Sequence, residues 1–413
     1  MASALLLAGT ANAQLFSDDF ESYGLGEYIG PNSVEWRVWS NTGEGTAEDV
    51  VTTNVNSNSG SQSIFFSSTA ANGGPQDVVL DFGQLRNTDI FKFSSNFFVN
   101  QGKNAYFNFQ GANTIGSVYS LNVRMDGGVI SIDDGSAVRL TASYPENSWF
   151  NLEISPNLTT GIWEAKVDNV SVGKWSNGTN AVRYLDLYPI NGSEFFVDDV
   201  VFDAIAHTVE NLNASTSELN VEAELAGRTT TPTLEVVNTG NTAITSMEVT
   251  LDYNGVTYTK SVSGLNIAAG GSEEVSFDPI TIAAGALPIV ATITAINGGA
   301  DDNADDNTTQ ISVNPIVPAV GKMVLGEEGT GTWCPWCPRG EVFMKSQDDK
   351  YADYWVGVAV HNADPMEYTP YDSGMQFSGY PSAKVDRGAI VDPSAMGGPV
   401  SYTHLRAHET KPN

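Results

Sequence analysis

The two cysteines of the 413-residue chain lie together in the stretch GTWCPWCPRG (331–340). A strand-like segment, 322–328, precedes Cys334 and Cys337, and the segment 337–351 contains a helical stretch. A thiol at the start of a helix faces free backbone N–H groups and the positive end of the helix dipole, which stabilise a thiolate. A second thiol one turn later can close a disulfide and release a substrate. The spacing therefore predicts thiol–disulfide exchange, with Cys334 as the attacking thiol and Cys337 as the resolving thiol.

Two other roles compete with redox chemistry for the cysteine pair. A zinc site needs four ligands, and beyond the two cysteines only His207 and His361 are credible candidates. A purely structural disulfide with this spacing closes a very short loop, so its entropic stabilisation is small. A redox-inactive domain that keeps the disulfide stays open as an alternative.

The C-terminal part of the chain is similar to a family of outer-membrane-related, thioredoxin-like proteins of Bacteroidota-type bacteria. The following residues carry the resemblance: Trp333-Cys334, Trp336-Cys337-Pro338-Arg339-Gly340, His361-Asn362, Asp364-Pro365 and Gly379-Tyr380-Pro381. The resemblance implies a thioredoxin-like α/β domain over residues 316–399, a Cys334–Cys337 disulfide, and protein thiols or disulfides as partners. It implies no cofactor for the redox chemistry.

The same resemblance assigns roles to residues outside the cysteine motif. Glu328 occupies the place of a buried acid that assists proton transfer, although Glu327 is an alternative for that role. Pro381 occupies the place of a cis-proline opposite the cysteines. One departure is Gly329, where the family usually has an aromatic residue, and this puts the packing under the strand in doubt.

Residues 14–204 have the pattern of an all-β domain. Alternating or aromatic-rich segments are separated by Gly, Asn and Asp turns, as in a sandwich or jelly roll. The segments FSDDFESY (16–23) and EFFVDDVVFDA (194–204) open and close the region, which resembles a laminin-G or concanavalin-like jelly roll with paired first and last strands. Such pairing would bring together carboxylates for a structural Ca²⁺, a hard cation that takes oxygen ligands. The candidate ligands are Asp18, Asp19, Glu21, Asp198 and Asp199.

Residues 205–315 predict a second sandwich, which resembles an immunoglobulin-like domain. The stretch 246–262 alternates on both sides of Asn254-Gly255, and Asn-Gly between alternating strands is a strong hairpin signal. The acidic stretch GGADDNADDNTTQ (298–310) lacks the EF-hand spacing and is interpreted as a solvated turn.

Composition limits the compartment and the partners. Lys and Arg number 19 against 49 Asp and Glu, and the net charge of −30 repels nucleic-acid phosphates. No apolar run is long enough for a transmembrane segment. Residues 1–13 resemble a partial secretory signal peptide with an A-x-A cleavage pattern. Residues 400–413 resemble a translated sequencing adapter, so the domain 316–399 is interpreted as truncated.

The sequence thus predicts a secreted or cell-surface, outer-membrane-associated protein. Its fold class is multidomain: an all-β jelly-roll sandwich, an immunoglobulin-like β-sandwich and a truncated α/β thioredoxin-like domain. Two functions compete. The first is thiol–disulfide oxidoreduction carried on β-sandwich binding or spacer modules. The second is surface adhesion or carbohydrate binding, with a polysaccharide or cell-surface glycan as partner and a redox-inactive C-terminal domain.

Overall fold

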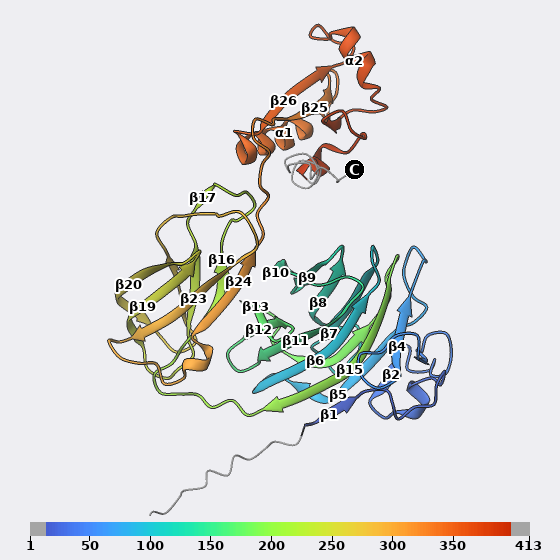
Figure 1. Ribbon diagram of the computed structural model, residues 1–413, viewed down its shortest axis with the longest axis vertical. Coiled ribbons are helices and arrows are strands. Elements are labelled where there is room, and N and C mark those ends of the chain that lie inside the picture. The colour runs from blue at the N-terminus through green and yellow to red at the C-terminus, as the bar shows by residue number, and fades with distance from the viewer. Residues whose placement is uncertain (1–13, 398–413) are drawn as a thin grey trace, which may run out of the picture. The chain divides into compact units, whose positions relative to one another are not determined.

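The computed structural model describes residues 14–397 and is built almost entirely of strands (Figure 1). The predicted signal peptide and the adapter-like tail lie outside the described residues. Contacts divide the chain into two compact units. The first comprises Met1–Val221, Pro232–Asp278 and Pro288–Ser312, and the second comprises Glu222–Thr231, Pro279–Leu287 and Val313–Asn413. The domain boundaries predicted at 204 and 315 stay predictions.

The first unit begins with a sandwich of two antiparallel sheets, which confirms the predicted β-sandwich. The eight-stranded sheet runs in the order β13 (Val170–Ser176), β12 (Ile162–Val167), β11 (Trp149–Asn157), β6 (Ile90–Val99), β15 (Glu194–Ile205), β4 (Ser63–Ser67) and β3 (Thr52–Thr53), with β1 (Phe16–Asp18) paired to β15. The seven-stranded sheet runs in the order β10 (Val138–Ser143), β9 (Val129–Asp133), β8 (Tyr119–Asp126), β7 (Asn104–Gln110), β14 (Val182–Leu187), β5 (Val78–Arg86) and β2 (Trp36–Val38). Phe16 lies opposite Phe202, so the first and last strands pair as expected.

Strict alternation along the strands decides which residues fill this sandwich. On β7, Phe107 and Phe109 are fully buried in the core, whereas Tyr106 and Asn108 stand on the opposite face of the sheet. Each buried side chain of this size contributes about 1.5–3 kcal/mol of hydrophobic stabilisation. The core is therefore rich in aromatic residues, and the outer face of the seven-stranded sheet carries polar ones.

The second part of the first unit is another pair of sheets. One contains β16 (Ala214–Asn220), β18 (Thr233–Asn238) and β21 (Ser272–Ser276). The other runs in the order β20 (Val256–Ile267), β19 (Ile244–Tyr253), β23 (Leu287–Ile296) and β24 (Thr308–Val313). Asn254 and Gly255 both have positive φ, at 49° and 75°, and they join β19 to β20 as the predicted hairpin.

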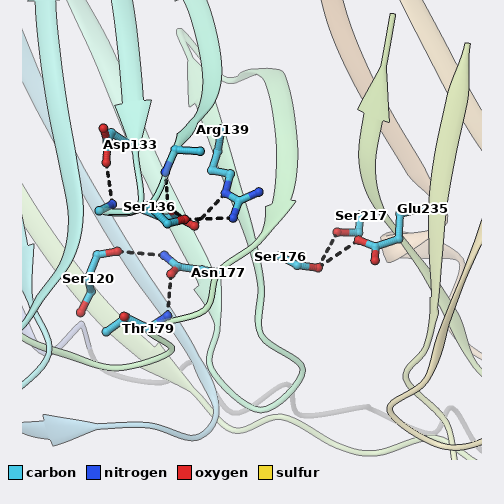
Figure 2. A network of polar contacts seen from close by, with 12 residues as sticks. Ser120, Asp133, Ser136, Arg139, Ser176, Asn177, Thr179, Ser217 and Glu235 are labelled. Atoms are coloured by element: carbon cyan, nitrogen blue, oxygen red, sulfur yellow. Dashed lines mark hydrogen bonds and ion pairs between the residues drawn. The ribbon is translucent and has the colours of Figure 1, made fainter.

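Polar contacts link the two sandwiches within the first unit. Figure 2 shows Ser176 on β13 facing Ser217 and Glu235, at 2.9 Å and 3.1 Å. Lys174 donates to the hydroxyl of Thr216 at 3.2 Å and to the carbonyl of Asp306 at 3.0 Å. Burial lowers the pKa of Lys174, so these acceptors are what hold its ammonium group in the interface.

The second unit is a small α/β arrangement. Its sheet places β25 (Val324–Thr330) between β26 (Trp355–His361), which is parallel to it, and β27 (Ser382–Val385), which is antiparallel. Two helices, α1 (Pro338–Tyr351) and α2 (Thr369–Met375), accompany the sheet, and the segments 222–231 and 279–287 add the short strands β17 (Thr229–Thr230) and β22 (Ile280–Thr281). The described part of the chain also contains three 3-10 helices: η1 (Gly30–Asn32), η2 (Ala304–Asp306) and η3 (Pro393–Ala395). No helix within residues 14–397 is long and apolar enough to cross a membrane.

Candidate functional site

The cysteine pair lies between β25 and the start of α1. Cys334 and Cys337 form a disulfide with a Cα–Cα distance of 5.5 Å, and Cys337 is the N-cap residue of α1. Both cysteines are buried, but the flanking Trp333 and Trp336 are 51% and 73% exposed. The buried disulfide is therefore flanked along the chain by two exposed indole rings.

Glu328 on β25 approaches the first turn of α1 beside the disulfide. Its side chain is 1% exposed, and a Cβ atom at Gly340 would lie only 2.7 Å from its Cδ. The absence of a side chain at position 340 is what lets the carboxyl group reach the helix. Burial and, to a smaller extent, the nearby charge of Glu341 raise the pKa of Glu328 to about 7. A carboxyl group with this pKa can take up and release a proton near neutral pH.

Its neighbour Glu327 points to the opposite face of the strand. Glu327 is also fully buried, but its carboxylate pairs with the guanidinium group of Arg387 at 2.6 Å and accepts a hydrogen bond from the hydroxyl of Tyr371. Strand alternation thus separates the two candidates for the proton-transfer role. The geometry favours Glu328, because Glu327 is already neutralised by a cation.

The segment around Pro381 lies against the residue that precedes the cysteines. The Tyr380–Pro381 peptide bond is cis, and the Tyr380 ring meets the Trp333 ring edge-on with centroids 5.5 Å apart. The hydroxyl of Tyr380 donates to Asp372 at 3.1 Å. Pro381 is therefore held near the start of the cysteine loop by an aromatic contact and a hydrogen bond.

The packing question raised by Gly329 has a clear answer. A Cβ atom at this position would lie 2.7 Å from the ring of Phe377, so the ring occupies the space that a side chain at 329 would fill. Phe377 in turn contacts Tyr380, with centroids 6.2 Å apart. An aromatic ring from another segment thus replaces the aromatic residue that the family resemblance leads one to expect.

Asp364 anchors the loop before the cysteines, a role that the sequence did not reveal. Its Oδ2 accepts from the backbone N–H of Thr332 at 2.8 Å and lies 2.7 Å from Nδ1 of His361. Burial alone would raise the pKa of Asp364, but the hydrogen bonds from His361 and Thr332 outweigh it and hold the pKa at about 2. The Nε1 atom of Trp333 donates to the carbonyl of Asn362 at 2.6 Å, which fixes the same loop.

The five carboxylates predicted to bind calcium each accept hydrogen bonds from donors of the protein, at separate places. Asp18 accepts from the hydroxyl of Tyr23 at 2.8 Å and from the indole of Trp36 at 2.9 Å. Asp198 and Asp199 bind the loop at Asn58, with the backbone N–H of Asn58 donating to Asp198 at 2.8 Å.

Glu21 accepts from the backbone of the next residues of that loop, Ser61 and Gln62. Asp19 accepts only from the backbone N–H of Glu21, at 3.2 Å. Among residues 14–397, no three His, Cys, Asp or Glu side chains are grouped so as to hold a metal ion. The five carboxylates thus accept protein donors, and calcium binding by them stays a prediction.

A cleft opens on the outer face of the seven-stranded sheet of the first sandwich. Its volume is about 530 Å³. The strands β7, β8 and β14 supply most of the residues that line it. Its walls carry a set of aromatic and polar side chains: Trp39, Tyr106, Tyr119, Asn122, Arg124 and Tyr188.

Three polar side chains form the base of the cleft. The amide nitrogen of Asn108 donates to Oδ2 of Asp186 at 2.6 Å, and Asp186 is also hydrogen-bonded to Asp77. Burial and the neighbouring carboxylate raise the pKa of Asp77 well above its usual range, and burial raises that of Asp186. The Oδ1 atoms of Asp77, Asn108 and Asp186 are buried and accept no hydrogen bond from any donor in the described structure.

The walls of the cleft are held rigid by their own contacts. The Tyr106 hydroxyl donates to Asn122 at 2.8 Å, and the Arg124 guanidinium stacks over the Tyr106 ring at 4.9 Å. The Tyr188 hydroxyl donates to the carbonyl of Asn72 at 2.6 Å, and Tyr119 remains 41% exposed. Aromatic walls above buried polar groups are typical of small-ligand sites.

The sequence alone did not indicate this cleft, because alternating aromatic residues in a β-sandwich are far more often interpreted as core. That interpretation is correct for Phe107 and Phe109, which are buried, but Tyr106 faces the cleft. The alternation of Tyr106 and Asn108 with the two phenylalanines is a signal that was present in the sequence. Asp77 and Asp186 gave no such signal, since they meet only in the folded sheet.

Comparison with known proteins finds likeness only at the level of solved structures. No protein-family model matches the chain, and no curated protein matches it. The cellulose induced protein Cip1 is 14% identical, over 46% of this chain and 98% of its own, with a TM-score of 0.30. The carbohydrate binding module CBM66 from Bacillus subtilis is 8% identical, over 42% and 98%, with a TM-score of 0.28. The Caenorhabditis elegans galectin LEC-6 is 11% identical, over 32% and 94%, with a TM-score of 0.24. Likeness at these scores adds nothing to the β-sandwich that the strand pairing shows directly.

Proposed function

We propose that the chain is an exported protein that binds a glycan in the cleft of its first sandwich. One observation carries the proposal: partly exposed aromatic rings stand over buried oxygen atoms that have no donor. Sugars present apolar C–H faces to aromatic rings and hydroxyl donors to acceptors. A buried acceptor without a hydrogen-bond partner costs free energy. A ligand whose hydroxyl groups donate to these oxygens would remove that cost, and binding would be stabilised.

The charges in the cleft favour an uncharged glycan. The Asp77–Asp186 pair shares a negative charge at its base, and Arg124 is the one basic residue among those that line it. Arg124 is occupied by its contact with Tyr106. With no cation bound at the base, a uronic acid or a sulfated sugar would meet like charge there, which is destabilising.

The glycan proposal is tested by calorimetric titration of the full chain with a panel of neutral and acidic oligosaccharides. Tyr119→Ala and Asn122→Ala should each weaken binding of a neutral glycan by about tenfold, the effect of losing about 1.4 kcal/mol. Tyr258→Ala on β20, which lies in the other sandwich, is the matched control and should bind as the parent does. Absence of binding by the parent chain across the panel, or equal affinity in all three variants, would refute the cleft as a glycan site.

Thiol–disulfide exchange at Cys334 and Cys337 is a second candidate function. A disulfide at the start of α1, beside a buried acid with a pKa near neutrality, supports it. In the reduced protein, the Cys334 thiolate would attack a partner disulfide and release one partner thiolate. The Cys337 thiolate would then attack the Cys334 sulfur, which releases the second partner thiolate and restores the disulfide. The two electrons pass to the partner, and no cofactor takes part.

The rival to this candidate is a redox-inactive domain, and thiol titration separates the two. After reduction of the full chain, Cys334 should be alkylated with an apparent pKa below about 7, as a helix N-terminus and an exchange function require. Turnover of a small disulfide substrate should follow the same titration. A thiol pKa near 8.5 together with no turnover would leave only the structural disulfide.

A further inference from the structure

We infer that Asp77, Asp186 and Asn108 form a binding site for a divalent cation, with Ca²⁺ as the ion that fits, at the base of the cleft. This site is separate from the five carboxylates near the first and last strands. It rests on protein oxygens alone and stands without the proposed glycan, whose hydroxyl groups would complete the coordination shell of the ion instead of bonding to these oxygens directly.

The contact between the two carboxyl groups is the first reason. Asp77 precedes β5 and Asp186 lies on β14, and their side chains are hydrogen-bonding partners. Two carboxyl groups this close can both stay ionised only if a cation lies between them; otherwise they share a proton and one of them is neutral. Burial strengthens the conflict, because water cannot screen the charges.

No side chain of the protein neutralises the pair. Within residues 14–397, no lysine or arginine forms an ion pair with either carboxylate. Arg124 on β8 lines the same cleft, but its guanidinium stacks on Tyr106 of β7. Glu48, from the loop after β2, adds negative charge near Asp77.

The tyrosines that face the pair also supply no positive charge. Tyr106 on β7, Tyr119 on β8 and Tyr188 after β14 line the cleft, and their phenols are neutral or, at high pH, anionic. Burial and the charge of Asp186 together raise the pKa of Tyr106 to about 12. Within residues 14–397, no side chain that faces the pair therefore supplies the positive charge that it lacks.

Asn108 explains why a cation fits better than a single proton. Asn108 is 1% exposed and lines the cleft, and its amide nitrogen is committed to Asp186 at 2.6 Å. Its Oδ1 has no donor, in addition to the Oδ1 atoms of Asp77 and Asp186. One proton joins two oxygens and leaves the third buried without a partner. A divalent cation can bind all three at once.

The chemistry of the three oxygens indicates which cation is favoured. Carboxylate and carboxamide oxygens are hard ligands, and Ca²⁺ accepts six to eight of them in flexible geometry. The open cleft, about 530 Å³ in volume, leaves room for water or ligand hydroxyl groups to complete the shell. The chain's net charge of −30 attracts cations to the surface from which the ion would enter.

Calcium titration of the full chain, freed of metal by a chelator and in the absence of glycan, tests the site. Asp186→Asn should remove one bound ion per chain or weaken its binding at least a hundredfold, and Asp77→Asn should do the same. Asp198→Asn is the control, because it alters the other predicted calcium site and leaves the cleft intact. Near-UV circular dichroism of each variant verifies that the aromatic core remains packed.

Terbium luminescence provides an independent readout, because Tyr106 and Tyr119 lie in the same cleft and can sensitise a lanthanide bound there. Sensitised emission should be lost in Asp186→Asn and kept in Asp198→Asn. Equal stoichiometry and affinity in the parent and Asp186→Asn would overturn the inference. An infrared band of a protonated carboxyl group would also overturn it, if the band is seen at neutral pH, persists when calcium is added and disappears in Asp77→Asn. Such a band would mean that a proton, and not a cation, lies between the two carboxyl groups. Either result leaves glycan binding to be judged by its own titration.

Discussion

The close approach of Glu328 to Gly340 predicts an unusual response to a Gly→Ala change. Replacing glycine by alanine inside a helix normally stabilises it by about 0.5–1 kcal/mol. At position 340 the new methyl carbon would lie 2.7 Å from Cδ of Glu328, closer than any stable contact. Overpacking of this kind costs about 1–3 kcal/mol. We therefore expect Gly340→Ala to destabilise α1 by up to about 2 kcal/mol.

Gly374 in α2 supplies the matched control. A Cβ atom at Gly374 would meet nothing within 4 Å, so Gly374→Ala should be neutral or stabilising by up to about 1 kcal/mol. Hydrogen exchange of the full chain, followed peptide by peptide, reports the local opening free energy of each helix separately. Amides of 341–351 in Gly340→Ala should exchange about tenfold or more faster than in the parent, since about 1.4 kcal/mol corresponds to a factor of ten.

The result that would refute this reasoning is equally specific. If Gly340→Ala slows exchange in α1 as Gly374→Ala does in α2, then no carboxyl group lies against the helix at position 340. The double variant Gly340→Ala/Glu328→Ala distinguishes a clash with Glu328 from one with another group. Removing the carboxyl group should restore most of the lost protection.

The remaining predictions concern the pH dependence of stability at Glu328, the identity of the attacking cysteine, and calcium binding by the five carboxylates. Because the pKa of Glu328 is raised to about 7 from 4.5, the stability that its protonated form contributes is complete below pH 4.5 and is lost as the pH rises through 7. Glu328→Gln should flatten this dependence in α1 hydrogen exchange. Cys337→Ser should trap mixed disulfides through Cys334, and trapping seen only with Cys334→Ser would reverse the assignment. Calcium should raise the melting midpoint of Asp186→Asn only if the five carboxylates near β1 and β15 bind it, and an unchanged midpoint removes that site.

Local patterns in the sequence determined much of the fold. Alternation of apolar and polar residues predicted the β-sandwich, and Asn254-Gly255 predicted the β19–β20 hairpin, because both signals depend only on neighbouring residues. The segments on either side of the cysteines likewise predicted a strand before them and a helix after them, and the family resemblance implied the Cys334–Cys337 disulfide. Each of these features is set by steric and hydrogen-bonding preferences within a few residues.

Only the tertiary structure shows which of two chemically similar residues occupies a given place in the site. Glu327 and Glu328 are adjacent and chemically alike, and only the orientation of β25 beneath α1 separates the neutralised carboxylate from the one at Gly340. Phe377 fills the space at Gly329 from a different segment, which no local pattern at 329 could show.

The base of the cleft depended entirely on tertiary structure. Asp77 and Asp186 are far apart in the chain, and they meet because β14 pairs with β5 in a register that places Leu187 opposite Val78. A shift of one residue would turn Asp186 into the core and remove the pair. That register is fixed by burial of the apolar face of both strands, a cooperative property of the whole sandwich. The sequence by itself therefore determined the strands and the thiols, and only the packing of the sheets decided which polar groups share the cleft.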